Sequence, residues 1–161
     1  MLFSAIYLLP FILPALAAPM KVSSELDKRQ DDKPDWLQQA EAAHWDCVGT
    51  GKRIDTIGQM NTCLQGLVSD AVDNAKAAYP GNNVFAIRTD KGMTWEVDRL
   101  TTRASFQSKQ WNSEEPVDYH VIVFKGAGTL NLNGVNYYHE RNWSAPYAER
   151  DGKVVFDDRG D

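Results

Sequence analysis

Four side chains that could carry out acid–base chemistry lie in the C-terminal third of the chain: His120, His139, Glu140 and Arg141. A histidine can accept or donate a proton near neutral pH, and an arginine can hold a phosphate or a carboxylate with paired hydrogen bonds. General acid–base catalysis requires two such groups that reach one substrate from the same side. One hypothesis is therefore an acid–base hydrolase of the ribonuclease type that uses His120, His139 and Arg141.

The elements around these residues decide whether they can cooperate. Residues 135–140 (VNYYHE) are predicted to form a strand, and successive side chains of a strand point to opposite faces. His139 and Glu140 would then point apart although they are adjacent in sequence. The face of His120 depends on the turn predicted at residues 126–128: a two-residue loop places His120 opposite His139, and a three-residue loop places both on one face. The sequence leaves both loop lengths open.

The other hypothesis gives this cluster no catalytic role. Tyr137, Tyr138, His139 and Arg141 would then be surface or half-buried strand residues, with a carboxylate beside Arg141. The sequence contains no Gly-x-Ser-x-Gly motif, phosphate-binding loop or His-Glu-x-x-His motif. We therefore expect no cofactor and no metal site, and we favour a protein that binds a partner over an enzyme.

Two helices are predicted ahead of the strands. Residues 34–46 open with Pro-Asp, which suits a first helical turn, and apolar residues recur there at helical spacing. Residues 57–78 keep a 3.6-residue apolar period over about six turns. Asp55 or Thr56 can cap this second helix, and Pro80-Gly81 ends it.

Beyond these helices the pattern changes to the alternation that is typical of strands. The predicted strands are residues 84–88, 93–97, 118–125, 129–133 and 135–140, with a last pair around NWSAPYAE and KVVFD. Turns at residues 89–92, 126–128 and Asn133-Gly134 are expected to join them as hairpins. Residues 98–116 are expected to be irregular, with Phe106 and Trp111 packing back as anchors. The order predicts an α+β fold, with two N-terminal helices packed on a mainly antiparallel β-sheet in a single small domain.

The first residues of the chain predict secretion. Residues 1–17 are almost wholly apolar, but the stretch is interrupted by two prolines and is shorter than the ~20 residues that a membrane-spanning helix needs. A signal peptide cut after Ala17 is the prediction. Residues 18–29 end in Lys28-Arg29, which resembles the dibasic maturation site of the fungal secretory route. We expect an extracellular domain of residues 30–161 that has no membrane segment once the signal peptide is removed.

Cys47 and Cys63 are the only cysteines in the chain. In a secreted protein two cysteines are expected to be oxidised, and only one intramolecular pairing exists. Closing a loop of about 15 residues contributes roughly 3 kcal/mol in the chain-entropy model. The predicted disulfide would join the end of the first helix to the second helix.

The charge of the predicted mature chain is acidic. Removing residues 1–29 leaves 14 of the 17 Lys and Arg and 20 of the 22 Asp and Glu, a net charge of −6. Without a basic run the chain has no electrostatic footprint for a phosphate backbone, so we expect no nucleic acid partner. We expect a monomer whose partner is a protein or a glycan.

The aromatic residues could anchor such a partner, because Trp and Tyr are frequent at interfaces. The candidates are Trp95, Trp111, Trp143, Tyr119, Tyr137, Tyr138 and Tyr147. The alternative is that most of them fill a small core. A protein that binds carbohydrate or cell wall, the third class considered, would show a row of exposed aromatic residues on one sheet face.

Several segments of the last third resemble one family. They are the run YHVIVF at residues 119–124, Thr129-Leu130, Asn142-Trp143 and the run RDGKVVF at residues 150–156. Over residues 117–157 the chain resembles an uncharacterised family of small secreted proteins of filamentous ascomycetes. That family carries a Gly-Gly pair before the Asn-Trp, where this chain has YYHER at residues 137–141. The resemblance implies a secreted fungal protein of the effector type that acts on a host, and it implies no reaction.

Asn142-Trp143-Ser144 is an N-glycosylation sequon in a chain that is expected to enter the secretory route. A glycan on Asn142 would lie beside the NYYHER run and hinder a partner that approaches it. The sequence therefore favours a secreted binding protein of the effector type, and the ribonuclease-like hydrolase and the carbohydrate-binding protein remain the alternatives.

Overall fold

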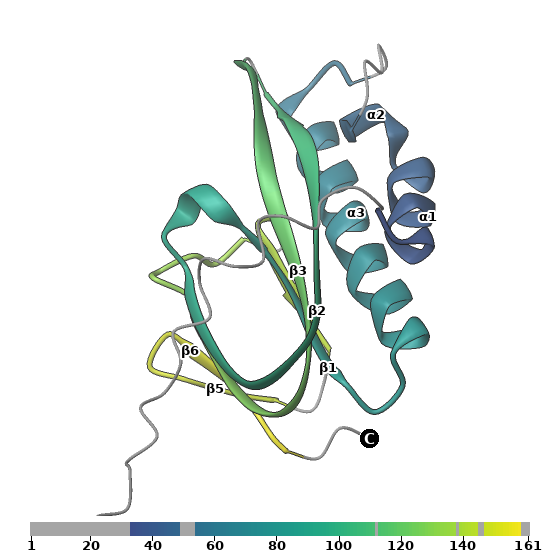
Figure 1. The fold of residues 1–161 in the computed structure, drawn as a ribbon. Helices are drawn as coiled ribbons and strands as arrows, with labels where there is room; N and C mark the ends of the chain where they lie inside the picture. Colours follow the sequence, from purple (N-terminus) through teal and green to yellow (C-terminus); the bar gives the residue numbers. More distant parts are fainter. Residues whose placement is uncertain (1–32, 49–53, 112, 138, 145–146, 159–161) are drawn as a thin grey trace, which may run out of the picture.

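The structure is a computed structural model, and it describes residues 33–48, 54–111, 113–137, 139–144 and 147–158. The predicted signal peptide with Ala17 and the dibasic site Lys28-Arg29 lie outside the described residues. A layer of helices covers one side of a strongly bent antiparallel sheet (Figure 1). The predicted α+β class and the single small domain are confirmed at this level.

The helical layer contains three segments: α1 (Asp35–Ala43), α2 (Trp45–Val48) and α3 (Ile57–Ala78). The single helix expected at residues 34–46 is wrong in one respect, because it breaks at His44, whose φ of −120° and ψ of 37° leave the helical region. The helix predicted at residues 57–78 is confirmed. Its start is a capping box, in which Thr56 Oγ1 accepts from the backbone N–H of Gln59 and Gln59 Oε1 accepts from that of Thr56, both at 3.2 Å.

The short helix α2 is fastened to α3 at two points. The predicted disulfide is confirmed, since Cys47 is bonded to Cys63. The second contact comes from His44, the residue before α2, whose Nε2 lies 2.8 Å from Oδ2 of Asp70, about two turns beyond Cys63 on α3. The imidazole of His44 rests over Gly66, where an added Cβ would overlap Cε1 of His44. Gly66 therefore leaves room for this ring, at a position where alanine would otherwise be the better helix former.

The sheet is built on one long hairpin. Its strands are β1 (Asn83–Arg88), β2 (Thr94–Gln110), β3 (Ser113–Asn131), β4 (Arg141–Trp143), β5 (Tyr147–Arg150) and β6 (Lys153–Phe156), with a short 3₁₀ turn, η2 (Thr89–Lys91), after β1. The order is β4-β1-β3-β6-β5, and β2 also pairs with β3. Every pairing is antiparallel.

Two pairs of strands share one edge of β3. Strand β2 lies along one edge for nearly its whole length, so β1 and β6 both lie along the other edge, β1 opposite residues 119–124 and β6 opposite residues 128–131. Between them Gly126 has a φ of 85°, and the β2–β3 register shifts there. The hairpin bends sharply at this bulge (Figure 1). We call β1 with β4 the first arm, and β6 with β5 the second arm.

Asn83 joins the two arms at the bend. Its carboxamide Nδ2 donates to the carbonyls of Gly126 at 3.1 Å and of Asp157 at 2.9 Å, and the residue is buried. Asp98 Oδ2 accepts from the backbone N–H of Ala127 at 2.9 Å on the β2 side of the same bulge. The bend is therefore held by two side chains, one from β1 and one from β2, that bond to backbone groups of β3 and of the residue after β6.

Several strand predictions are corrected by this topology. The expected turn at residues 126–128 is a bulge inside β3, so the question of its loop length disappears. Residues 84–88 and 93–97 do not form a hairpin, because both β1 and β2 pair with β3. Residues 98–116, expected to be irregular, belong mostly to the β2–β3 hairpin, in which Ala104, Phe106 and Ser108 are buried.

The predicted strand at residues 135–140 is also wrong. Asn133 and Gly134 do form a tight turn, with φ angles of 49° and 78° and a 2.9 Å hydrogen bond from the Val135 N–H to the Leu132 carbonyl. However, residues 135–137 are irregular and residues 139–140 form a turn. Residues Arg141–Trp143 then form β4, which pairs with β1 at one end of the strand order. The last predicted hairpin, β5–β6, is confirmed.

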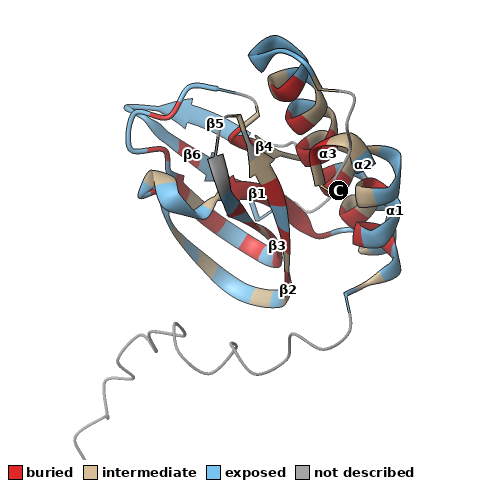
Figure 2. Cartoon of the chain, turned by 90° about the horizontal axis from the view of Figure 1, so that it is seen from above, coloured by how far each residue is buried: buried red, intermediate tan, exposed pale blue. Residues whose placement is uncertain are grey.

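Two apolar cores lie on the two faces of the sheet. Figure 2 shows that buried residues are found in the helices as well as in the central strands β1 and β3. The first fills the space between the helices and the sheet and includes Leu37, Leu67 and Val121. The second lies inside the bend, between the arms, and includes Phe85, Phe124 and Phe156. Because β1 contributes to both cores, its residues Val84–Ile87 are all buried, whereas β5 is exposed throughout.

Candidate functional site

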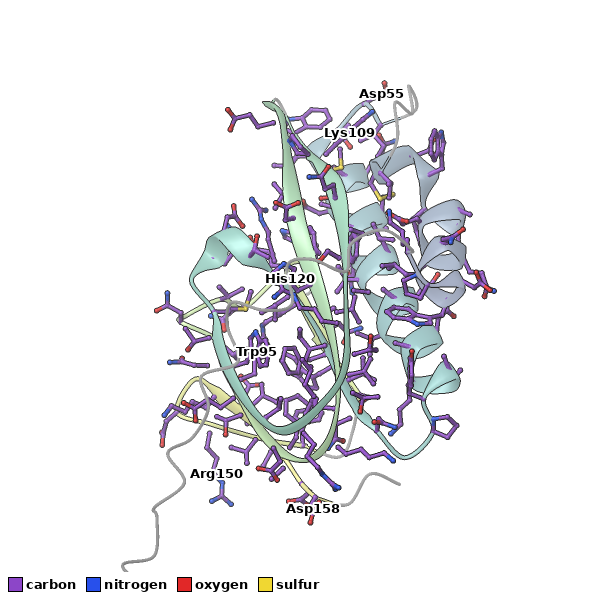
Figure 3. All side chains as sticks on the ribbon, in the orientation of Figure 1. Asp55, Trp95, Lys109, His120, Arg150 and Asp158 are labelled. Carbon is purple, nitrogen blue, oxygen red and sulfur yellow. A yellow bond between two sulfur atoms is a disulfide. The ribbon has the colours of Figure 1, made fainter. Side chains whose placement is uncertain are left out.

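His120 lies on β3 and faces the inside of the bend, on the side of the sheet away from the helices (Figure 3). Its Nε2 is 2.8 Å from Nη2 of Arg103 on the neighbouring β2 strand. A guanidinium has donors and no acceptor, so Nε2 of His120 must be the acceptor. The imidazole is therefore neutral in this arrangement, with its proton on Nδ1.

Arg141 shares this face with His120. In the sheet register Ile87 of β1 is opposite both residues, with His120 on one side and Arg141 on the other. Two strand spacings separate their backbones, about 10 Å. The side chain of Arg141 is only 5% exposed, and its Cζ lies 4.4 Å from the centre of the Trp143 ring. The structure thus brings these two predicted residues to one face, in contact with different neighbours.

His139 lies in the turn before β4, so strand alternation does not set its direction. Its carbonyl accepts a 2.8 Å hydrogen bond from the Tyr119 hydroxyl, and its ring is 5.4 Å from that of Tyr137. Burial lowers the pKa of His139, against the opposing effect of Glu140. Burial also raises the pKa of Tyr119 to about 12, which keeps its hydroxyl a donor. The polar contacts described for His139 are thus made with neither His120 nor Arg141.

Glu140 is a buried ion-pair partner. Its Oε1 accepts from Lys91 Nζ at 2.8 Å and lies 3.7 Å from Arg88 Nη1. Its carbonyl accepts from the Arg88 backbone N–H at 2.9 Å. Arg88 also pairs with Asp90, and this hydrogen bond holds the pKa of Asp90 below its usual value. These contacts anchor the turn before β4 to the end of β1.

The first and second arms meet where β4 and β5 approach each other. The rings of Trp143 and Tyr147 are 5.4 Å apart and nearly perpendicular, at 77°. A hollow of about 120 Å³ lies here, lined by Arg141, Asn142, Trp143, Tyr147 and Glu149. We call it the seam pocket. It combines an aromatic pair, a guanidinium, an amide and a carboxylate.

The N-glycosylation sequon forms part of this seam. Asn142 is half-buried, and its Oδ1 accepts from the backbone N–H of Trp143 at 2.8 Å. Ser144 is held against β1, with its Oγ 3.0 Å from the Val84 N–H and 3.3 Å from the Val84 carbonyl. The sequon therefore lies in ordered structure at the wall of the seam pocket.

The aromatic candidates divide between core and surface. Tyr119 is fully buried and stacked on Phe106, which confirms Phe106 as an anchor, and Trp95 and Trp111 are half-buried. Tyr137 and Tyr147 are exposed, at 65% and 48%. Tyr138 lies outside the described residues. The exposed aromatic side chains of the described ranges lie on separate elements, so the extended row that the carbohydrate-binding alternative would show on one sheet face does not appear there.

Sequence reasoning missed the seam pocket. In the sequence, Tyr147 is one of several aromatic candidates, and Glu149 is the last residue of NWSAPYAE, a segment predicted only to form part of the last strand pair. Trp143 and Tyr147 are only four residues apart, but the chain changes its pairing between them, β4 with β1 and β5 with β6, and no local pattern predicts these partners.

A second hollow, of about 340 Å³, lies between α1 and α3 and is lined by Asp35, Trp36, Gln39, Asn74, Ala77 and Ala78. It is a wide, open groove that contains a single ionisable side chain among the residues that line it. The seam pocket is therefore the better candidate for specific recognition.

Within the described parts of the chain, no three His, Cys, Asp or Glu side chains gather as they would around a metal ion. Nor does any helix there have the length and apolar character needed to cross a membrane. Comparisons with protein-family models, with curated proteins and with solved structures found no match to this chain.

Proposed function

We propose that the chain is a secreted binding protein whose partner docks at the seam pocket, and that it acts as an effector on a host outside the fungal cell or within host tissue. The observation that carries this proposal is the meeting of Arg141, Trp143, Tyr147 and Glu149 at one hollow. Pockets that bind ligands combine aromatic walls with a few convergent polar groups, as this one does.

Secretion rests on several independent features. The Cys47–Cys63 disulfide is expected in an oxidising compartment. The apolar start of the chain, the site after Ala17 and the dibasic Lys28-Arg29 fit export and maturation. The effector role rests on the resemblance of residues 117–157 to small secreted proteins of filamentous ascomycetes.

A ribonuclease-like hydrolase is the second candidate, since His120 and Arg141 share a sheet face. We favour binding because both side chains are already engaged. Arg103 occupies Nε2 of His120, and Arg141 is nearly inaccessible against Trp143. A catalytic role would require both groups to leave these contacts, whereas Tyr147 is available to a partner as it stands.

Two measurements test the proposal, both on the mature chain secreted from its full-length precursor. The first is an RNA cleavage assay of the wild type beside His120→Ala. The second follows backbone and indole amide signals by NMR while four probes are added: N-acetylchitotriose, mannotriose, AMP and acetylated tripeptide amides. We expect no histidine-dependent cleavage and a saturable shift of the seam-pocket signals with at least one probe.

Tyr137→Ala is the matched control for Tyr147→Ala, because both remove an exposed tyrosine and only Tyr147 lines the pocket. Binding that is weakened by Tyr147→Ala and untouched by Tyr137→Ala supports the proposal. RNA cleavage that disappears in His120→Ala would replace it with the hydrolase. If none of the four probes shifted the NMR signals of the seam-pocket residues, the proposed binding function would also be wrong.

A further inference from the structure

We infer that the seam pocket binds one neutral sugar ring. This inference rests on the proposed function and adds the chemical class of the ligand. It is carried by the charges, the aromatic walls, the size and the surroundings of the pocket, which are considered in turn.

The charged groups of the pocket favour a neutral ligand. Arg141 offers only hydrogen-bond donors, and Glu149 offers only acceptors when ionised. Arg141 and Glu149 carry opposite charges within this small space, so the attraction of a charged ligand to one is offset by its repulsion from the other, and a ligand of either sign gains little. A hydroxyl group can donate to the exposed Glu149 carboxylate without carrying a charge, so a polyhydroxylated ring suits this wall of the pocket.

The aromatic walls favour a ring with an apolar face. Trp143 and Tyr147 stand nearly perpendicular, at 77°, and form two sides of the hollow. The face of an aromatic ring carries partial negative charge, which attracts the weakly positive C–H groups of a saturated ring. Arg141 lies against Trp143, so the 48% exposed Tyr147 is the wall that an incoming sugar would meet first.

The size of the pocket limits the ligand to one residue. Its volume of about 120 Å³ is well below the range of roughly 300–1,000 Å³ that holds a drug-sized molecule. A longer glycan would place one sugar in the pocket and continue outside it. The neighbouring strand β5, exposed along its whole length, leaves space for that continuation.

This sugar could come from two sources with the same chemistry. One is a separate glycan, of the host or of the cell wall. The other is an N-glycan of the chain itself, because Asn142, the acceptor of the sequon, is one of the residues that line the pocket. The experiment must therefore compare chains with and without a glycan on Asn142.

The first arm of the experiment uses the isotopically labelled chain secreted in the presence of tunicamycin, which blocks N-glycosylation without changing any residue. N-acetylchitotriose and mannotriose are titrated separately. A saturable shift at Trp143 and Tyr147 that Tyr147→Ala weakens by about tenfold, the scale of one lost aromatic contact, supports a separate glycan. Tyr137→Ala should bind like the wild type.

Glu149→Gln provides a second variant, which keeps a side chain of the same shape and should also weaken binding. The amide spectrum of each variant, compared with that of the wild type, verifies that it is folded. In the second arm the chain is secreted without tunicamycin. Nuclear Overhauser contacts between the first sugar on Asn142 and the rings of Trp143 or Tyr147 would identify the chain's own glycan as the occupant.

The outcomes separate this inference from the proposed function. If the tripeptide amides or AMP shift the seam signals and neither sugar does, and no sugar–ring contact appears, the sugar inference is overturned while the proposed binding function stands. If no probe and no attached glycan contacts the seam, both are overturned.

Discussion

The guanidinium of Arg103 lies 2.8 Å from Nε2 of His120, inside the bend of the sheet and across the β2–β3 pair. This contact fixes the tautomer of the histidine, because the donor can only be the arginine. It joins two residues that the sequence offers no reason to pair, since the intervening segment was expected to be irregular.

The first prediction concerns that tautomer. Nitrogen-15 correlation spectra of the imidazole should show His120 with its proton on Nδ1 at neutral pH. Replacing the donor in Arg103→Met should move the population towards the Nε2–H form, which predominates in free neutral histidine. Arg99→Met removes an exposed arginine from the same strand and should leave the tautomer unchanged. An Nε2–H form in the wild type would contradict the assigned contact.

The second prediction concerns pH and His139. Burial lowers the pKa of this imidazole from the ordinary value of 6.5, so the unfolded chain binds the proton more tightly than the folded chain. The free energy of unfolding should therefore fall as the pH drops below 6.5, and this contribution is fully present above it. Proton NMR should give His139 a midpoint below 6.5 in the folded chain.

Urea unfolding at a series of pH values tests the same prediction through stability. Between pH values just above and well below the ordinary histidine pKa, the loss of stability should be smaller in His139→Gln than in the wild type. Asn136→Gln, an exposed change three residues away, should keep the full dependence. Equal pH profiles for the wild type and His139→Gln would count against a buried neutral His139.

The third prediction concerns Gly66 in α3. A glycine-to-alanine change inside a helix normally stabilises by roughly 1 kcal/mol. Here the added methyl group would overlap the His44 ring and push it from Asp70, so Gly66→Ala should instead destabilise by about 1–2 kcal/mol. Thermal or urea unfolding measures the difference.

Two companion variants make this a test of the contact itself. Gly58→Ala, in the first turn of the same helix, meets only Thr56 Oγ1 at 3.9 Å and should stabilise. In a His44→Ala background, Gly66→Ala should become stabilising as well. If Gly66→Ala destabilised equally with and without the histidine, the steric explanation would be wrong.

The fourth prediction concerns Asn83 at the bend. Asn83→Ala removes both donors from the carbonyls of Gly126 and Asp157 and should cost about 2 kcal/mol of stability. Asn83→Asp should cost more at neutral pH, because a buried carboxylate would face the two carbonyl oxygens. Burial would raise the pKa of that new carboxyl, so the stability gap between the two variants should narrow as the pH falls.

Urea unfolding of both variants at neutral and acidic pH is the measurement. Asn136→Asp, at an exposed position, should change stability little at any pH. If Asn83→Asp were as stable as Asn83→Ala at neutral pH, the Asn83 carboxamide would not be what holds the two arms together.

The parts of the fold that the sequence predicts well are those with local causes. The start of α3 depends on Thr56 and Gln59, three residues apart, and its length on an apolar period within the helix itself. The Cys47–Cys63 pairing was the only one available. The Asp151-Gly152 turn is flanked by its two partner strands, so the β5–β6 hairpin was also predictable.

The errors have non-local causes. A glycine with positive φ suits both a turn and a bulge, so Gly126 alone could not tell a hairpin from a bent strand. Likewise Asn133-Gly134 makes the expected turn, but the partner of the chain that follows is β1, some fifty residues earlier. The neighbours of Arg141 follow from that pairing, so the sequence names Arg141, Trp143 and Tyr147 as separate candidates and does not predict that they meet at one hollow.

The shared edge of β3 has a consequence for the order of assembly. Strands β1 and β6 depend on β3 and not on each other, so each arm can form separately once the β2–β3 hairpin exists. Trp143 and Tyr147 are only four residues apart, but their native ring geometry requires both arms to be paired, so this contact is expected to form after the rate-limiting step. Weakening it by Tyr147→Ala would therefore accelerate unfolding and leave the refolding rate nearly unchanged. The surface proposed to recognise a partner would also be the last to form during folding.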